Sequence, residues 1–373
     1  MKVVIAIDSF KGSMTSMQAG YAAKAGVLRA HPEAEVVVRP LADGGEGTTD
    51  ALVEGLGGIM RTLRVTGPLG NPVMASYGIL PESKTAVMEM AAAAGITLER
   101  EQHPLKATTY GVGEMIMDAI SQGCRNFIIG IGGSATNDGG IGMLQALGYT
   151  FLDSDGKTVE GGAGSLEKIA SVDDSQVAET LKMCNIQVAC DVNNPLCGPN
   201  GATYVYGPQK GVTGALLETV EQGMKNFAVV SADYLGKDFS EVPGTGAAGG
   251  MGFALLAYLN GKLTAGIDLI LDAIKLEQEI QTADYVITGE GRLDFQTAMG
   301  KVPVGVAKMA KKYEKRVIAF SGSVTPDARA CNASGIDAFF PILRSVVTLE
   351  EAMKTENAQN NMIDTVEQVF RLI

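Results

Sequence analysis

Histidine and cysteine are scarce in this sequence. Both histidines are isolated: His31 ends a predicted helix just before Pro32, and His103 lies in a polar run. The five cysteines are dispersed and form no Cys-x-x-Cys pair; they are Cys124, Cys184, Cys190, Cys197 and Cys331. This pattern argues against a structural zinc site and is typical of a reduced compartment. We assign neither histidine a catalytic role.

Long hydrophobic runs are also missing. An apolar stretch such as residues 251–259 is too short to cross a bilayer. The first residues lead directly into a predicted strand and then to Asp8, so we expect no signal peptide. We therefore expect a soluble, cytoplasmic protein with no membrane partner.

Positive charge is in deficit. The chain has 30 basic and 42 acidic residues, a formal net charge of −12, and nucleic-acid binding requires a basic face. We therefore expect no nucleic-acid partner, although local cations could still hold a small anionic substrate. A 46% apolar, 19% charged chain of 373 residues is typical of a globular protein with two domains.

Two common catalytic signatures are absent. No G-x-x-x-x-G-K-[ST] loop is present, so a nucleoside triphosphate would be held by backbone N–H groups and separately placed cations. No G-x-S-x-G elbow is present either, which argues against a serine hydrolase.

The sequence instead repeats one pattern, a short apolar run followed by an acid or a Gly/Ser cluster. Continuous apolar runs are typical of buried parallel strands, and ligands of such sheets bind at the carboxyl ends of the strands. Carboxylates and glycines gathered there suit a metal ion and a phosphate. The runs at 3–7, 36–38, 127–129, 186–190 and 285–287 lead to Asp8, Asp43, the segment 130–140, Asp191 and Glu290.

The order of predicted elements indicates two interleaved domains. Strands and helices alternate up to residue 65 and again after 283, with helices at 14–31, 48–56, 302–312 and 350–372. Between them, a turn cluster at 66–72 and strand-like runs at 73–80 and 85–90 favour a mixed or antiparallel sheet. We predict an α/β fold: a doubly wound parallel-sheet domain (1–65 and 284–373) with an inserted mixed α/β domain (66–283) and a substrate cleft between them.

Two glycine-rich segments are candidate anion sites. Residues 130–135 satisfy G-x-G-x-x-A after a strand, with Asp153 near the distance of a ribose-binding acid, which leaves an NAD-dependent oxidoreductase open. However, residues 153–156 indicate a hairpin turn, and polar residues extend the loop to Gly140. The second segment, 244–249, has no strand before it but could hold an anion at the start of the next helix.

Six acids follow predicted strands, namely Asp8, Asp43, Glu46, Asp191, Glu290 and Asp294. Each alone is often a cap or turn residue, but six in comparable positions favour a site for Mg²⁺ with a neighbouring general base. The candidate cations are Lys11, Arg292, Lys301 and Lys210. Lys11 could stabilise a phosphoryl group in transfer, and Arg292 could bind a carboxylate bidentately.

Taken together, these segments resemble the bacterial glycerate kinase type I family over nearly the whole chain. The matching runs include 8–12, 42–48 and 132–140, followed by 190–196, 206–211, 246–250 and 288–294, with Gln296, Thr297, Gly300 and Lys301 completing them. The departures are small: Thr49 stands where an aliphatic residue is expected, and Leu293 where Ile is commoner.

The resemblance implies ATP-dependent phosphorylation of D-glycerate, usually on the 2-hydroxyl, and a flavodoxin-like domain with an inserted second domain. We assign catalysis to Asp191, favoured as the base, with Lys11 and Asp8. Substrate binding is assigned to Arg292, Ser9, Asn193 and Glu290, the nucleotide to Gly132, Gly133, Ser134, Thr136 and Asn137, and Mg²⁺ to Asp43, Glu46 and Asp294. A kinase of another small hydroxy acid or polyol, or a non-catalytic ligand-binding regulator, stays open.

Overall fold

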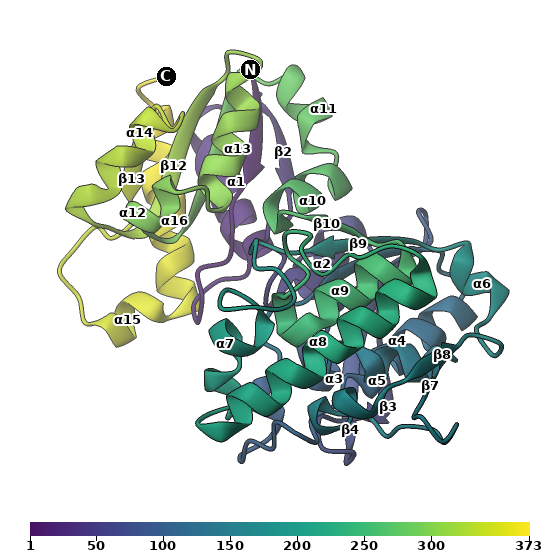
Figure 1. The fold of residues 1–373 in the computed structure, drawn as a ribbon. Helices are drawn as coiled ribbons and strands as arrows, with labels where there is room; N and C mark the ends of the chain where they lie inside the picture. The colour runs from purple at the N-terminus through teal and green to yellow at the C-terminus, as the bar shows by residue number, and fades with distance from the viewer. The chain divides into compact units, whose positions relative to one another are not determined.

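The computed structural model describes residues 1–373, which divide into two compact units. Unit 1 comprises Met1–Asp43, Asp50–Gly57 and Ile267–Ile373, and unit 2 comprises Gly44–Thr49 and Gly58–Gly266. The chain therefore passes from one unit to the other four times, after residues 43, 49, 57 and 266. Each unit has its own sheet, coloured by residue number in Figure 1.

Unit 1 is a doubly wound domain with five parallel strands. Its sheet has the order β13-β12-β11-β1-β2, which is the flavodoxin-like order 2-1-3-4-5 when the strands are counted along the chain. The strands are β1 (Lys2–Ala6), β2 (Glu35–Arg39), β11 (Tyr285–Leu293), β12 (Arg316–Val324) and β13 (Ala338–Pro341). The helices are α1 (Ser16–Ala30), α2 (Thr48–Leu56, shared with the preceding segment of unit 2), α10 (Gly266–Ala273), α11 (Leu276–Gln281), α12 (Phe295–Ala298), α13 (Val302–Lys311), η4 (Pro326–Arg329), α14 (Ala330–Ala333), α15 (Leu349–Met353) and α16 (Thr355–Phe370). The predicted fold class is confirmed.

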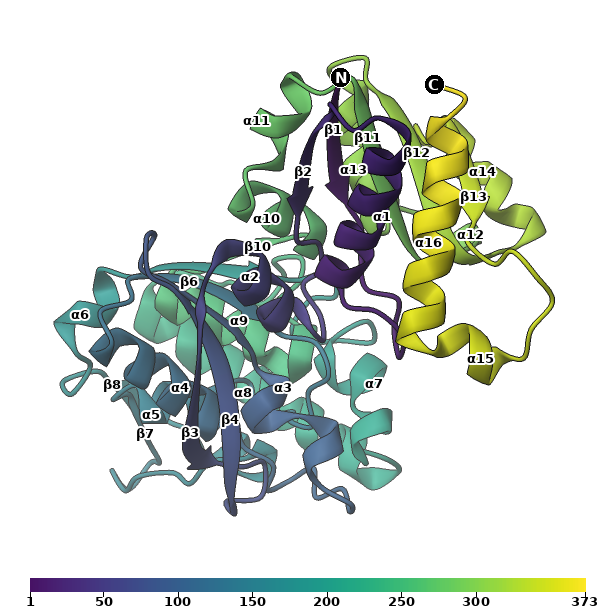
Figure 2. The ribbon, with the colours of Figure 1, turned by 180° about the vertical axis from the view of Figure 1, so that it is seen from behind.

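Helices cover both faces of this sheet. Figure 2 shows α1 and α16 side by side on one face, and Figure 1 shows α13 on the other. Helix α1 begins at a capping box in which Thr15 and Gln18 satisfy each other's backbone N–H groups. Gly26 permits the close approach of α16, because a Cβ there would lie 2.5 Å from the Ile363 carbonyl oxygen. The segment 7–15, which joins β1 to α1, is therefore held between a buried strand and a packed helix.

Unit 2 contains a six-stranded mixed sheet of order β10-β9-β6-β5-β4-β3, in which only β4 runs antiparallel to its neighbours. Its strands are β3 (Ile59–Thr66), β4 (Pro72–Leu80), β5 (Thr85–Glu89), β6 (Asn126–Gly130), β9 (Asn185–Ala189) and β10 (Lys262–Thr264), with a separate pair β7 (Thr150–Leu152) and β8 (Ser171–Asp173). Its helices are α3 (Ala91–Ala94), η1 (Ile96–Leu98), α4 (Tyr110–Ser121), α5 (Ile141–Ala146), η2 (Ala163–Lys168), α6 (Glu179–Lys182), α7 (Ala202–Tyr206), η3 (Pro208–Lys210), α8 (Ala215–Leu235) and α9 (Ala247–Leu259).

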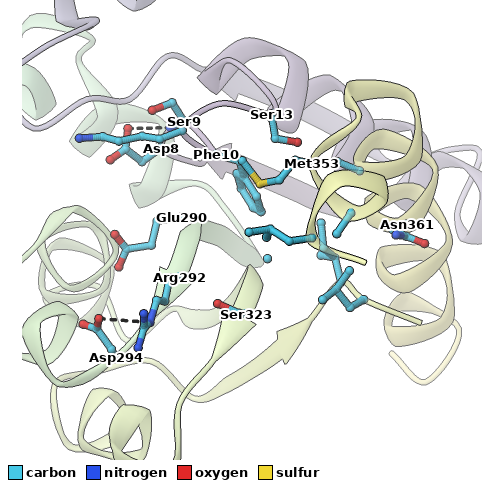
Figure 3. Close-up of a pocket in the computed structure, with 18 of the residues that line it drawn as sticks. Asp8, Ser9, Phe10, Ser13, Glu290, Arg292, Asp294, Ser323, Met353 and Asn361 are labelled. Atoms are coloured by element: carbon cyan, nitrogen blue, oxygen red, sulfur yellow. Dashed lines mark hydrogen bonds and ion pairs between the residues drawn. The ribbon is translucent and has the colours of Figure 1, made fainter. Parts of the chain in front are cut away.

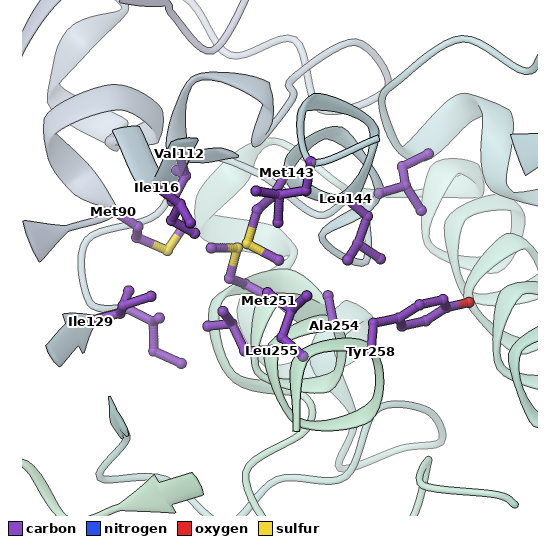
Figure 4. Packing of buried hydrophobic residues seen from close by; sticks show 14 of the residues in the cluster. Met90, Val112, Ile116, Ile129, Met143, Leu144, Met251, Ala254, Leu255 and Tyr258 are labelled. Carbon is purple, nitrogen blue, oxygen red and sulfur yellow. The ribbon is translucent and has the colours of Figure 1, made fainter. Parts of the chain in front are cut away.

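The core of unit 2 is rich in methionine and aliphatic side chains. Met143 of α5 and Met251 of α9 lie together over Ile129 of β6 (Figure 4), and all three are fully buried. Flexible thioethers fill irregular gaps in a core, which agrees with methionine being present as packing material. The core holds the strand ends that carry the glycine loop.

Two predicted boundaries and one predicted helix need correction. β3 pairs with β4 over its whole length, so residues 58–65 belong to unit 2. Residues 267–283 belong to unit 1, where Tyr313 donates a hydrogen bond to Glu277 of α11. The helix expected at 350–372 is two helices, because Lys354 is extended (ψ 126°) between α15 and α16. Thr348 starts α15 as a separate cap, accepting from the Glu351 N–H.

Candidate active site

Unit 1 contains a cavity of about 470 Å³ beside the carboxyl ends of β1 and β11. These strands flank the point where the strand order reverses, which is where open α/β sheets bind ligands. Seven of the predicted site residues line it, namely Asp8, Ser9, Lys11, Asp43, Glu290, Arg292 and Asp294. Lys301, also a candidate cation, joins them. Figure 3 shows Asp8 and Ser9 on one side and Glu290, Arg292 and Asp294 on another.

Asp8 is the most strongly perturbed acid of this cavity. Its pKa is raised from 3.8 to about 7, mainly by burial and in smaller part by the nearby carboxylates of Asp43 and Glu290. The Ser9 N–H, which donates to Asp8 Oδ1 at 2.7 Å, and the Lys11 ammonium oppose this rise. An acid with a pKa near neutrality can exchange a proton with a substrate at physiological pH.

The second strand end carries a more constrained acid pair. Glu290 accepts a hydrogen bond from Thr297 Oγ1 at 2.5 Å, and burial raises its pKa. Asp294 caps α12, accepting from the backbone N–H groups of Gln296 (2.9 Å) and Thr297 (3.3 Å). Asp294 therefore acts as a helix cap, as an acid after a strand often does. Its role as a metal ligand stays a prediction.

Arg292 is available to bind an anion. Its side chain is 65% exposed, and its Nε lies 3.7 Å from Asp294 Oδ2, a distance too long for a strong hydrogen bond. Arg292 lines the same cavity as Asp8 and Ser9, and Figure 3 shows its guanidinium turned towards Asp294.

One side of the cavity was not found by the sequence analysis. It is apolar and comes from Phe10 and from the segment around α15, including Ile342, Leu349 and Met353. Figure 3 shows Phe10 and Met353 close together, facing away from Arg292. The sequence signal for this side was the group of apolar residues Val346, Val347 and Leu349, which are exposed in the folded chain.

The nucleotide-binding residues predicted from the sequence lie in unit 2, in the loop after β6. Gly132 and Gly133 are exposed, whereas Ser134, Thr136 and Asn137 are buried. The side-chain atoms Thr136 Oγ1 and Asn137 Oδ1 have no hydrogen-bond partner within the protein. Buried polar atoms are rarely left unpaired, so this loop is suited to a ligand or water that supplies the partners.

A second glycine segment packs directly on this loop. Ala248, Gly249 and Gly250 at the start of α9 are all left-handed, and the Gly139 N–H donates to the Gly249 carbonyl at 2.9 Å. A Cβ at Gly249 would lie 2.1 Å from the Thr136 carbonyl oxygen, so no other residue fits. The two glycine-rich segments predicted separately from the sequence form one structural element.

The remaining predicted residues of unit 2 are exposed. Asp191 follows β9, and its Oδ1 accepts the Gly266 N–H at 2.8 Å; Asn193 lies two positions on. Glu46 lies in the segment 44–49, which Glu89 anchors by accepting from the N–H groups of Gly47 and Thr49. Sequence analysis missed Glu89, although it ends a strand as the other acids do.

Neither a metal cluster nor a membrane span is present. Nowhere in residues 1–373 do three or more His, Cys, Asp or Glu side chains gather as a metal centre would require. None of the helices combines the length and apolarity needed to cross a bilayer.

A glycine-rich loop after a buried strand and a charged cavity at the switch point of a flavodoxin-like sheet are features of an α/β enzyme of small metabolites. The Glycerate kinase family model matches residues 3–373, and the chain belongs to that family. It is 48% identical over 356 residues to a glycerate kinase of Bacillus subtilis (strain 168), covering 95% of this chain and 93% of that protein. A glycerate 2-kinase of Escherichia coli (strain K12) is 47% identical with the same coverage.

The fold also matches a solved structure. A crystal structure from Salmonella typhimurium LT2, named as a glycerate kinase 2, superimposes with a TM-score of 0.91 at 45% identity, covering 99% of this chain and 97% of that one. The agreement across both units shows that the predicted family membership is correct. It also removes the support for an oxidoreductase on residues 130–135, since the helix after that loop begins only at Ile141.

Proposed function

We propose that the protein transfers the terminal phosphoryl group of ATP to the 2-hydroxyl of D-glycerate, giving 2-phosphoglycerate and ADP. The observation that carries this proposal is the cavity of unit 1. It is lined by Asp8, whose pKa is about 7, and by the cations Lys11 and Arg292. The family membership supports the kinase activity, and the naming of one relative as a glycerate 2-kinase supports the regiochemistry. The catalytic cleft expected between the two domains stays a prediction.

Glycerate is a small anion with two hydroxyl groups, and the cavity offers complementary partners. The Arg292 guanidinium binds its carboxylate through two parallel hydrogen bonds. Ser9 and Glu290 lie on the neighbouring strand ends and bind the hydroxyl groups. Asn193 remains a proposed contributor from unit 2.

Two acids are candidates for the base that accepts the hydroxyl proton. Asp191, favoured from the sequence, is exposed and already accepts one backbone hydrogen bond. Asp8 is half-buried with a pKa of about 7, close to the value at which a general base is most effective. We therefore propose Asp8 as the base and keep Asp191 as the competing assignment.

The acids of the cavity are chemically suited to Mg²⁺, although no cluster holds a metal by protein groups alone. Mg²⁺ usually binds one or two carboxylates and fills its remaining positions with water and phosphate oxygens. Asp43 and Glu290, whose charges both raise the pKa of Asp8, would hold it there. When bound, the ion supplies charge neutralisation for the phosphates.

The glycine loop of unit 2 is proposed to cradle the nucleotide phosphates. The exposed backbone of Gly132 and Gly133 and the hydroxyl groups of Ser134 and Thr136 would provide donors of the kind that replace a Walker A loop. The unpaired atom of Asn137 is the acceptor Oδ1, so this residue would need a donor from the ligand or from water. Phosphoryl transfer depends mainly on positioning and charge stabilisation, so such a loop is sufficient without a covalent intermediate.

A coupled ADP-release assay across hydroxy acids tests the proposal. We expect turnover with ATP and D-glycerate, and ³¹P NMR of the product should give the 2-phosphate. Turnover with glycerate that yields the 3-phosphate would overturn the regiochemistry alone. Preference for a different hydroxy acid would favour the second candidate, a kinase of another small hydroxy acid, since the cavity is larger than glycerate needs.

Replacing Arg292 by Ala should raise the KM for glycerate roughly 10- to 100-fold with little change in kcat, because a hydrogen bond to a charged group contributes about 1.5–3 kcal/mol. Steady-state kinetics with glycerate varied at saturating ATP measures this. Arg292→Lys keeps the charge but loses the planar fork, so an intermediate KM is expected. An unchanged KM in Arg292→Ala would assign the carboxylate to another cation.

A further inference from the structure

Lys210 is a buried lysine with no role in the function proposed above. It ends η3 within the run Tyr206–Gly211, which the sequence analysis singled out, and is only 2% exposed. Its Nζ donates to Ser134 Oγ and to the Thr136 carbonyl oxygen, both at 2.7 Å. Both acceptors belong to the glycine loop, so this buried side chain holds the loop through two hydrogen bonds.

The other end of the loop is held by a buried acid. Asp138 accepts from the N–H groups of Thr109 (2.8 Å), Gly140 (3.1 Å) and Gly142 (3.3 Å), and from Thr109 Oγ1 at 2.9 Å. Residues 134–142 are therefore fixed at both ends by buried ionisable groups. The atoms left without partners, Thr136 Oγ1 and Asn137 Oδ1, lie between these two supports.

A purely structural support would not need a lysine. Burying an ammonium costs free energy, and an apolar side chain packed beneath a loop avoids that cost. A neutral amine has two N–H donors, which match the two acceptors of the loop, whereas an ammonium has a third that finds no protein acceptor. The arrangement suits a group that is neutral when the loop is empty and charged when an anion is bound.

We propose that Lys210 is a positioning residue that sets the phosphate-binding conformation of Ser134–Thr136 and takes up a proton when nucleotide phosphates bind there. The inference rests on the proposed function, specifically on the loop being the phosphate site. Lys210 acts through Ser134 and the Thr136 carbonyl and needs no direct contact with the nucleotide.

The charged groups around Lys210 are consistent with this behaviour. Burial lowers the pKa of Lys210 to about 7, and Asp138 partly opposes the effect. Lys210 lines a small cavity of about 20 Å³, which is large enough for one water molecule. The ionisable residues Glu99, Glu101 and His103 line the same cavity. His103 lies 3.8 Å from Glu101, so this cavity has no uncompensated positive charge that would oppose protonation.

Calorimetric titration of the full-length protein with MgATP at pH 8, in two buffers of different ionisation enthalpy, counts the protons taken up. Because burial lowers the pKa of Lys210 to about 7, its amine is mostly neutral at pH 8 and mostly charged at pH 6. We expect proton uptake on MgATP binding to be larger at pH 8 than at pH 6. MgATP binding without this pH-dependent uptake would overturn the inference and leave the proposed function standing.

Lys210→Met fills the same volume and separates positioning from packing. It should abolish the uptake at pH 8 and raise the KM for MgATP about tenfold, with the KM for glycerate nearly unchanged. Lys182→Met is the matched control, because Lys182 is an exposed lysine of the same unit, and it should behave as wild type. Wild-type uptake or affinity in Lys210→Met would refute the role, and if that variant does not fold, the wild-type titrations decide. A wild-type protein that binds no MgATP would refute the proposed function itself.

Discussion

Asp8→Asn should lower kcat by about 10²- to 10⁴-fold while leaving the KM for glycerate within a few-fold of wild type. The amide has nearly the same shape as the carboxylic acid but cannot accept the hydroxyl proton. It still accepts the Ser9 N–H, which donates to Asp8 Oδ1, so the turn after β1 should keep its conformation. Steady-state kinetics at pH 7.5 with saturating ATP provides the measurement.

The same substitution should stabilise the protein at high pH. The pKa of Asp8 is about 7 in the folded state against 3.8 for the ordinary side chain, so the folded state binds more protons between these values. The contribution of Asp8 to the free energy of unfolding therefore falls as pH rises from about 4 to 7, and Asp8→Asn lacks this loss. Since each pKa unit corresponds to ~1.4 kcal/mol, the gain at pH 8 has a ceiling of about 4 kcal/mol.

Denaturant unfolding at pH 5 and pH 8 in magnesium-free buffer separates this effect from a general change in packing. A stabilisation that is larger at pH 8 supports the buried charge, and an equal one at both values contradicts it. Loss of turnover together with a gain in stability is the combination expected of a catalytic base whose charged form is destabilised by its surroundings.

Asp191→Asn is the comparison that decides the identity of the base. Asp191 is exposed, and its Oδ1 accepts the Gly266 N–H at 2.8 Å. If Asp8 is the base, Asp191→Asn should lower kcat far less than Asp8→Asn does. The reverse order of the two variants would restore Asp191, which the sequence analysis favoured, and remove Asp8 from the chemistry.

Much of the fold could be predicted because local patterns and long-range structure agree. The continuous apolar run Val3–Ile7 is fully buried and forms most of β1, which lies between β11 and β2. The helix predicted at 48–56 has those bounds in the structure. The strand β3 escaped prediction because its side chains alternate between exposed and half-buried, so it has no continuous apolar run. Only its pairing with β4 assigns it to unit 2.

The site shows where sequence reasoning stops. The acids at 8, 43, 290 and 294 could be grouped because parallel strands end at the same edge of a sheet. Lys210 could not be placed in this way, since its partner Ser134 is 76 positions away and η3 has no sheet register. The apolar side around Met353 was missed for a similar reason, because the helix expected at 350–372 breaks at Lys354.

Lys11→Ala should lower kcat by about 10²- to 10³-fold, the loss seen when one preorganised stabiliser of transition-state charge is removed. Lys11 is exposed, lines the cavity and follows Phe10 in a tight turn closed by the backbone bridge between Phe10 and Met14. Gly12 next to it adopts φ 76°, which fixes the path of the turn without using the lysine side chain. Truncating Lys11 should therefore change the charge of the cavity and leave the backbone intact.

The kinetic signature distinguishes transition-state stabilisation from simple anion binding. Removing a cation that stabilises the phosphoryl group in transfer lowers kcat and kcat/KM equally. Removing a cation that only binds the ground-state anion mainly raises KM. Lys301→Ala is the matched control, because Lys301 is also an exposed lysine lining the cavity, and it should lose much less. Lys11→Arg keeps the charge on a longer, planar head group and should recover part of the rate. Near-normal turnover in Lys11→Ala would exclude Lys11 from the mechanism and leave Lys301 and Arg292 to neutralise the transferred phosphoryl group.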